Sequence, residues 1–172
     1  MLLITSILLF VSGLLCYFIF KNKKQKKIEK IYTVLNEMLV VSRAGKILII
    51  KSDVRPGKDV NFEIKFFASR NSDEKIRLKF RDIKIDNVTA NVLQSVKDEK
   101  AAFVEVDSFP EGEIKQSLLD RNSEYFEMHF LKEDAGIFYM CSIESGEKSN
   151  RFKDLLKRKA IDNGINILRA IL

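Results

Sequence analysis

The sequence predicts a mostly-β domain that follows an N-terminal transmembrane helix and ends in a C-terminal helix. Residues 2–20 carry no charged side chain, apolar and polar residues alternate from Lys46 onward, and helical spacing returns near the end of the chain. A chain of 172 residues accommodates one domain and an appendage. We therefore divide it into a transmembrane anchor (1–20), a basic juxtamembrane segment with a helical stalk (21–42) and a β-barrel-like domain (43–172).

The positive charge of the chain is confined to one short segment. Six lysines against Glu29 alone contribute +5 of the net charge of +6. No other part of the sequence has the broad basic surface that follows a phosphate backbone, so we expect no nucleic-acid partner. The six are Lys21, Lys23, Lys24, Lys26, Lys27 and Lys30.

The apolar segment is long enough to cross a bilayer, since nineteen helical residues span roughly 28 Å. A cleaved signal peptide needs a basic start and small residues at a cleavage site, and the sequence has neither. A lipoprotein needs a small residue before the modified Cys16, where this chain has leucine. A buried core helix is disfavoured by the length of the segment and by its basic flank. The lysines predict that the flank following the helix faces the cytoplasm. The expected location is thus the inner membrane, single-pass, with the lysines against the bilayer and its anionic headgroups.

The stalk helix is expected over residues 28–41, and Ser42 to Gly45 form a turn. Strands follow at short intervals, with a bulge near Asp82 and one short helix over 114–120. About seven strands of this kind predict a small closed or split β-barrel. The expected strands cover 46–50, 60–66, 76–85, 88–96, 101–106, 126–130 and 137–143.

The end of the chain is expected to be helical over residues 150–162, with apolar residues on one side and basic residues around them. Its apolar side either packs on the barrel or lies on the inner leaflet. Gly164 is predicted to stop this helix in the left-handed conformation. Residues 165–172 fit either a final strand or a second helical piece.

The sequence offers little for catalysis. His129 is the only histidine, lies in an alternating strand and is expected to be structural, and no nucleophile, phosphate-cradling or metalloprotease motif occurs. The two cysteines, Cys16 and Cys141, form neither a disulfide framework nor a metal motif. We expect no enzyme activity, no metal and no cofactor.

One stripe of cations points to ligand binding. Alternation places Arg77, Lys79 and Arg81 on one strand face, where they either bind phosphate or form a solvated surface. The barrel, the C-terminal helix and the R-x-x-x-R of Arg77 and Arg81 resemble the PilZ proteins. The segment from Val88 to Ile143 resembles the split barrel of flagellar-brake proteins, through residues 101–107, Pro110, 125–130 and 138–143. The resemblance implies cyclic di-GMP binding by the arginines and by Asp107 and Ser108, although the arginines lie inside a strand and the serine stands one place early.

Without intact ligand motifs, such a barrel would be a protein-interaction module. The expected function is a membrane-anchored cytoplasmic adaptor or scaffold that binds another protein at the inner membrane. The alternative is a PilZ-like sensor of cyclic di-GMP.

Overall fold

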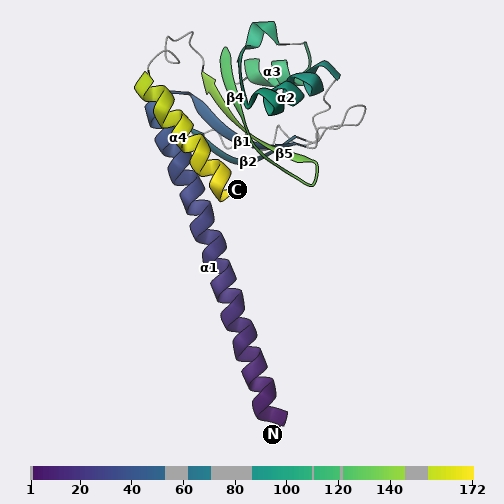
Figure 1. Cartoon of the computed structure of the whole chain (residues 1–172), viewed down its shortest axis with the longest axis vertical. Helices are drawn as coiled ribbons and strands as arrows, with labels where there is room; N and C mark the ends of the chain where they lie inside the picture. The colour runs from purple at the N-terminus through teal and green to yellow at the C-terminus, as the bar shows by residue number, and fades with distance from the viewer. Residues whose placement is uncertain (1, 53–61, 71–86, 110, 121, 146–154) are drawn as a thin grey trace.

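The computed structural model describes residues 2–52, 62–70, 87–109, 111–120, 122–145 and 155–172, with the side chains of residues 2–16, 62, 87–90, 113, 114 and 155 outside that description. Its centre is a five-stranded antiparallel sheet in the order β2-β1-β5-β4-β3 (Figure 1). The strands are β1 (Lys46–Ser52), β2 (Phe62–Ser69), β3 (Ala101–Glu105), β4 (Tyr125–Asp134) and β5 (Ile137–Ser145). The helices are α1 (Leu2–Ser42), α2 (Asn87–Glu99), α3 (Glu113–Leu119) and α4 (Leu155–Ile171), with a short 3-10 helix, η2 (Val106–Ser108).

Helices cover both faces of this sheet. Helices α2 and α3 lie over one face, and α1 with α4 lie over the other (Figure 1). Because successive strand residues point to opposite faces, Leu48 and Ile50 enter the core under α2 and α3, while Ile47 and Ile49 enter the core under α1 and α4. Burial on both faces explains the uninterrupted apolar run of β1. We call these two clusters the α2–α3 core and the α1–α4 core.

The predicted closed or split barrel of seven strands is wrong. Strands β2 and β3 stand at the two ends of the strand order, so the described sheet is open. The expected strand over 88–96 is instead helix α2, in which Leu93 and Val96 enter the α2–α3 core one turn apart. Strand 76–85, with its bulge near Asp82, lies outside the described residues.

The structure decides the conformation of the C-terminal segment. Helix α4 continues through Gly164 to Ile171, so the predicted stop at Gly164 is wrong and residues 165–171 are helical. A Cβ atom at Gly164 would lie 2.5 Å from both Cγ and Sδ of Met38 in α1. Glycine therefore favours the close approach of the two helices, and this reason is separate from the termination of a helix. Ile161, Ile165 and Leu168 fill the α1–α4 core beneath it.

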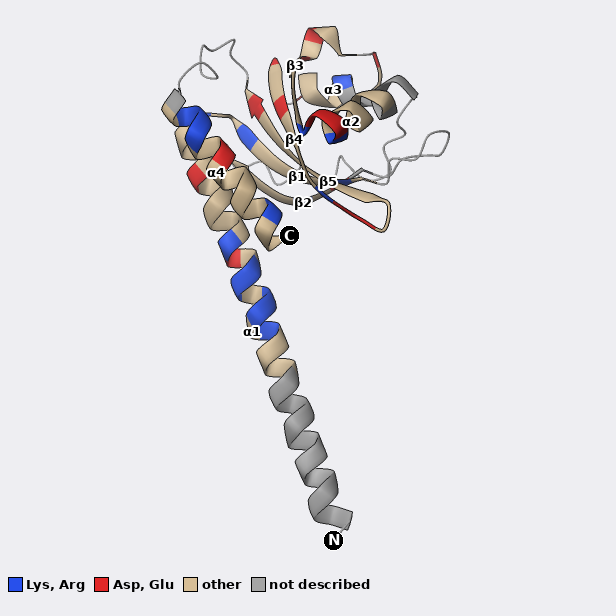
Figure 2. Ribbon diagram, viewed as in Figure 1, with Lys and Arg blue, Asp and Glu red and all other residues tan. Residues whose placement is uncertain are grey.

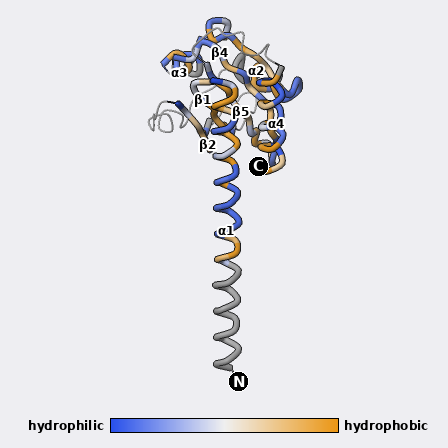
Figure 3. Tube along the Cα trace, turned by 90° about the vertical axis from the view of Figure 1, so that its left-hand side faces the viewer, coloured by the Kyte–Doolittle hydropathy of each residue, from blue (hydrophilic) through white to orange (hydrophobic). Residues whose placement is uncertain are grey.

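Helix α1 is a single helix of 41 residues, and its C-terminal part packs on the domain. Ile31, Leu35 and Met38 are buried against the sheet and α4, while the hydrophilic segment before them leads away from the domain (Figure 3). No helix of the described residues is long and apolar enough to span a membrane. This finding contradicts the predicted transmembrane anchor and the inner-membrane location, and both are withdrawn.

Candidate functional site

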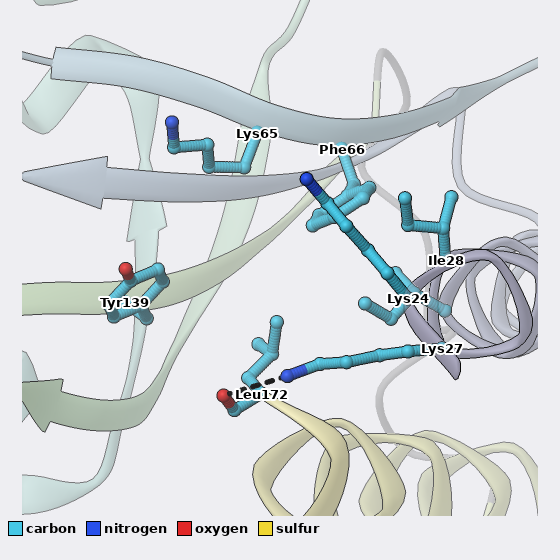
Figure 4. Close-up of a pocket in the computed structure, with 8 residues that line it drawn as sticks. Lys24, Lys27, Ile28, Lys65, Phe66, Tyr139 and Leu172 are labelled. Atoms are coloured by element: carbon cyan, nitrogen blue, oxygen red, sulfur yellow. Dashed lines mark hydrogen bonds between the residues drawn. The ribbon is translucent and has the colours of Figure 1, made fainter. Parts of the chain in front are cut away.

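A cavity of about 290 Å³ opens where α1, the sheet and the end of α4 meet. Helix α1 supplies its residues from the turns just before the buried part of the helix, β2 and β5 supply residues from the sheet face that α1 covers, and Leu172 closes one side (Figure 4). The lining residues are Lys24, Lys27, Ile28, Ile31, Lys65, Phe66, Tyr139 and Leu172. We call this cavity the lysine pocket.

Three ammonium groups give the pocket its charge. Lys24 and Lys27 are three residues apart on α1 and therefore share a side of the helix (Figures 2 and 4). The Lys27 Nζ donates to the main-chain oxygen of Leu172 at 3.3 Å. Lys65 of β2 pairs with Glu63, with 2.5 Å between Nζ and Oε1, whereas no described residue pairs with the Lys24 ammonium group. The pocket thus retains positive charge.

The pocket walls are apolar and partly aromatic. Phe66 from β2, Tyr139 from β5, Ile28 from α1 and Leu172 surround the pocket with carbon surface (Figure 4). The Phe66 ring is held edge-on against Tyr32 of α1, with 5.7 Å between ring centroids. A molecule in this pocket would meet cations at the rim and apolar surface within.

A second polar group lies on the same sheet face but is enclosed. The side chains of Glu127 and His129 in β4 are 2% and 4% exposed, and 2.9 Å separates the Glu127 Oε1 from the His129 Nε2. Arg158 of α4 donates to the same oxygen and also pairs with Asp162 at 3.4 Å. The contact joins α4 to the sheet.

The ionisation of this buried group follows from its neighbours. Burial acts to raise the pKa of Glu127, but His129 and Arg158 outweigh it and leave the pKa below its ordinary value. Cys141 of β5 stands beside His129 in the strand pairing. Burial and then the Glu127 charge raise the pKa of this thiol. Cysteine, histidine and glutamate are therefore neighbours, but the thiol stays protonated and is not an activated nucleophile.

The structure separates the residues that the sequence grouped for ligand binding. Arg77, Lys79 and Arg81 lie outside the described residues. Asp107 and Ser108 are exposed in η2, on the face of the sheet covered by α3. The Ser108 hydroxyl donates to the Glu105 main-chain oxygen at 2.7 Å, and the Asp107 main-chain oxygen accepts from Lys115 at 3.1 Å. Whether Asp107 and Ser108 bind a ligand stays a prediction.

The lysines predicted to contact headgroups have different surroundings in the structure. All six are exposed and lie in the basic segment of α1, which is blue in Figure 2. Two of them, Lys24 and Lys27, also line the pocket. Sequence reasoning missed Lys65, Phe66 and Tyr139 as site residues. Their alternation identified strands, but the pairing of β2 with β1 and of β1 with β5 is what brings them beside α1.

Comparison with known proteins identifies the fold. No protein-family model matches the chain, and no curated protein matches its sequence. Among solved structures, the GAF domain of a two-component sensor histidine kinase from Bacillus halodurans has a TM-score of 0.53 at 10% identity, over 81% of this chain and 90% of that one. A GAF3 domain from Synechocystis in its photoproduct state has a TM-score of 0.55 at 13% identity, over 84% and 94%. The fold is therefore GAF-like.

A third structure extends this likeness. The chromophore-binding domain of a bacteriophytochrome from R. palustris has a TM-score of 0.53 at 9% identity, over 87% of this chain and 60% of that one. These structures overturn the resemblance to PilZ and flagellar-brake barrels, because they share the open sheet flanked by helices. The barrel adaptor and the PilZ-like cyclic di-GMP sensor are withdrawn with that resemblance. At these identities the likeness concerns the fold alone.

Proposed function

We propose that this protein is a non-catalytic sensory domain that binds a small molecule in the lysine pocket. The observation that carries the proposal is the position of the pocket, which is lined by α1, by the sheet and by the last residue after α4. A ligand there touches α1 and Leu172, the residue that directly follows α4, so its binding energy acts on the relative placement of the two helices.

The fold-likeness supports a sensory role. One structural neighbour belongs to a sensor histidine kinase, and another is a chromophore-binding domain. A domain of this kind passes the bound state on to another protein segment, and α1 is suited to this because it extends well beyond the sheet (Figure 1). A protein partner is accordingly part of the proposal.

The absence of catalysis is also proposed here. Within the described residues, the one Cys–His–Glu neighbourhood is buried, and its thiol is kept protonated. The lysine pocket contributes ammonium groups and apolar walls, which hold a molecule but supply no activated nucleophile. We expect a bound compound to be recovered unchanged.

The first test is a thermal-shift screen of the full chain against small metabolites of mixed charge. A sensory domain should be stabilised by at least one compound, because a ligand of the native state raises its melting temperature. The stabilisation should vanish in Ile28→Trp, whose larger side chain fills the pocket, and persist in Val40→Trp, which enlarges an exposed position of the same helix. Equal stabilisation of both variants would place the ligand elsewhere.

The second test asks whether the ligand alters the helix pair. Spin labels at the exposed positions Asn36 of α1 and Asn166 of α4, in a Cys16→Ser background, report the distance between the two helices, while buried Cys141 stays unlabelled. A compound from the screen should shift or narrow that distance distribution. An unchanged distribution at saturation would contradict the sensory role and leave simple binding.

A further inference from the structure

We propose that the ligand of the lysine pocket is a small organic anion with a single apolar or aromatic body, such as an aryl or short acyl carboxylate or phosphate. This inference rests on the proposed function and specifies its ligand class. It follows from the charge of the pocket, from its size and from the hydrogen bonds that two lysines donate to the main-chain oxygen of Leu172.

The charge argument begins with Lys24, Lys27 and Lys65. Neighbouring cations repel one another, and the pocket lining contributes no carboxylate side chain to offset them. Glu63 compensates Lys65 alone, from outside the lining. An anionic ligand removes this repulsion, whereas a cationic ligand adds to it.

The main-chain oxygen of Leu172 indicates where an anionic oxygen would be held. It accepts from Lys27 at 3.3 Å (Figure 4) and from Lys132 at 2.7 Å. Two ammonium groups therefore converge on one acceptor at the pocket edge. Lys132 is itself held over the Tyr139 ring, 5.0 Å from its centroid. A carboxylate or phosphate oxygen of a ligand would accept from such amines in a charge-assisted hydrogen bond, which is about twice as strong as one between neutral groups.

The apolar lining and the volume define the rest of the ligand. Ile28, Ile31, Phe66 and Tyr139 present carbon surface, which an inorganic anion leaves unused. Small-molecule pockets commonly enclose about 300–1,000 Å³, and this one lies at the lower limit with about 290 Å³. One ring or a short chain fits this volume, and a dinucleotide does not.

The test uses four matched probes on the full chain, followed through the backbone amide resonances of Phe66 and Tyr139. Phenyl phosphate has both the anion and the ring, inorganic phosphate has the anion alone, phenol has the ring alone, and phenyltrimethylammonium reverses the charge. Phenyl phosphate should give saturable shifts at the lowest concentration, and raised salt should weaken them. If phosphate or phenol binds as tightly, or if the cation binds, the inference is wrong.

Single lysine substitutions locate the binding. Lys24→Met should weaken phenyl phosphate binding about tenfold, the effect of losing one charge-assisted contact. Lys23→Met removes the neighbouring charge of the same helix without touching the pocket lining and should change binding less than twofold, as a rough bound for a screened charge. Equal weakening by both variants would show diffuse attraction to α1 and would overturn the site.

The two proposals can fail separately. If the thermal-shift screen finds a neutral or cationic ligand that Ile28→Trp excludes, the sensory function stands and the anion inference falls. If phenyl phosphate binds as described but leaves the distance between α1 and α4 unchanged, the ligand class stands and the sensory role falls.

Discussion

At the scale of single residues, the buried carboxylate of Glu127 shows how the sheet tolerates a charge. A carboxylate away from water is unfavourable unless partners compensate it, and His129 with Arg158 provides that compensation. Arg158 keeps its side chain 36% exposed and so remains partly solvated. The ion pair between Arg158 and Glu127 therefore joins α4 to β4 without placing two fully desolvated charges together.

This contact predicts a pH dependence of stability. The folded-state pKa of Glu127 lies below the ordinary value of 4.5, so the unfolded chain takes up its proton first as pH falls. The stabilisation is complete above about pH 5.5 and is lost as pH decreases through the folded-state pKa. Glu127→Gln should lower the unfolding free energy by about 3 kcal/mol near neutral pH, and by less as pH falls toward the folded-state pKa.

Urea unfolding of both proteins across this pH range measures the difference. Glu124→Gln is the control, because Glu124 is exposed, lies three residues away in sequence and has no described ion pair. A constant gap between Glu127→Gln and the unsubstituted protein at all pH values would show that the side chain acts by packing alone.

At the scale of elements, the crossing of α1 and α4 depends on one missing side chain. Gly164 lets the backbone of α4 approach Met38, which is buried in the α1–α4 core. Elsewhere in a helix, replacing glycine by alanine gains about 1 kcal/mol of propensity. Here the added Cβ meets the Cγ and Sδ of a buried side chain, and crowding of this kind costs about 1–3 kcal/mol.

We therefore expect Gly164→Ala to lower the unfolding free energy by about 1 kcal/mol once both effects are combined. Asn163→Ala, at the exposed neighbouring position, should leave stability unchanged or raise it slightly. In a double-mutant cycle with Met38→Ala, the two changes should be less harmful together than their sum, with a coupling of about 1 kcal/mol. Additive effects would mean that Met38 moves aside freely.

The hairpin between β4 and β5 supplies a second prediction at this scale. Its turn residues, Ala135 and Gly136, have φ values of 50° and 79°, as a two-residue type I′ turn requires. Alanine is unfavourable at the first position, so Ala135→Asn should raise the melting temperature, with a gain of about 0.5–1 kcal/mol. Gly136→Ala should lower it by a similar amount because the left-handed conformation disfavours a Cβ. A Gly136→Ala protein as stable as the original would show that the turn relaxes.

At the scale of the whole molecule, the two cores share the central strands. β1 and β5 place alternate residues in the α2–α3 core and in the α1–α4 core, so neither face can open fully without disturbing both. Cys141 lies in β5 and is fully buried, which makes its thiol a reporter of this cooperativity.

In a Cys16→Ser background, we expect Cys141 to react with a thiol reagent only through global unfolding. The free energy of the opening that exposes this thiol, derived from its labelling rate, should fall with denaturant at the same slope as the free energy of unfolding. A cysteine introduced at exposed Asn36 of α1 should react at once and independently of denaturant. A shallow slope for Cys141 would mean that β5 opens locally, apart from the rest of the sheet.

The sequence by itself determined the local structure of those segments whose apolar residues follow a clear pattern between turns. The strand starting at Lys46 follows from a short apolar, β-branched run, and the strand around Phe126 and the short helix α3 follow from alternation and spacing. The sequence also located the lysine segment, but it did not show that Lys24 and Lys27 line a pocket. Only the tertiary structure decided that residues 88–96 are helical, since apolar residues at this density fit either period until Leu93 and Val96 meet a core. Only it decided that the sheet stays open, that Gly164 serves a helix crossing, and that Lys65, Phe66 and Tyr139 join Lys24, because strand order is set by contacts between residues far apart in the chain.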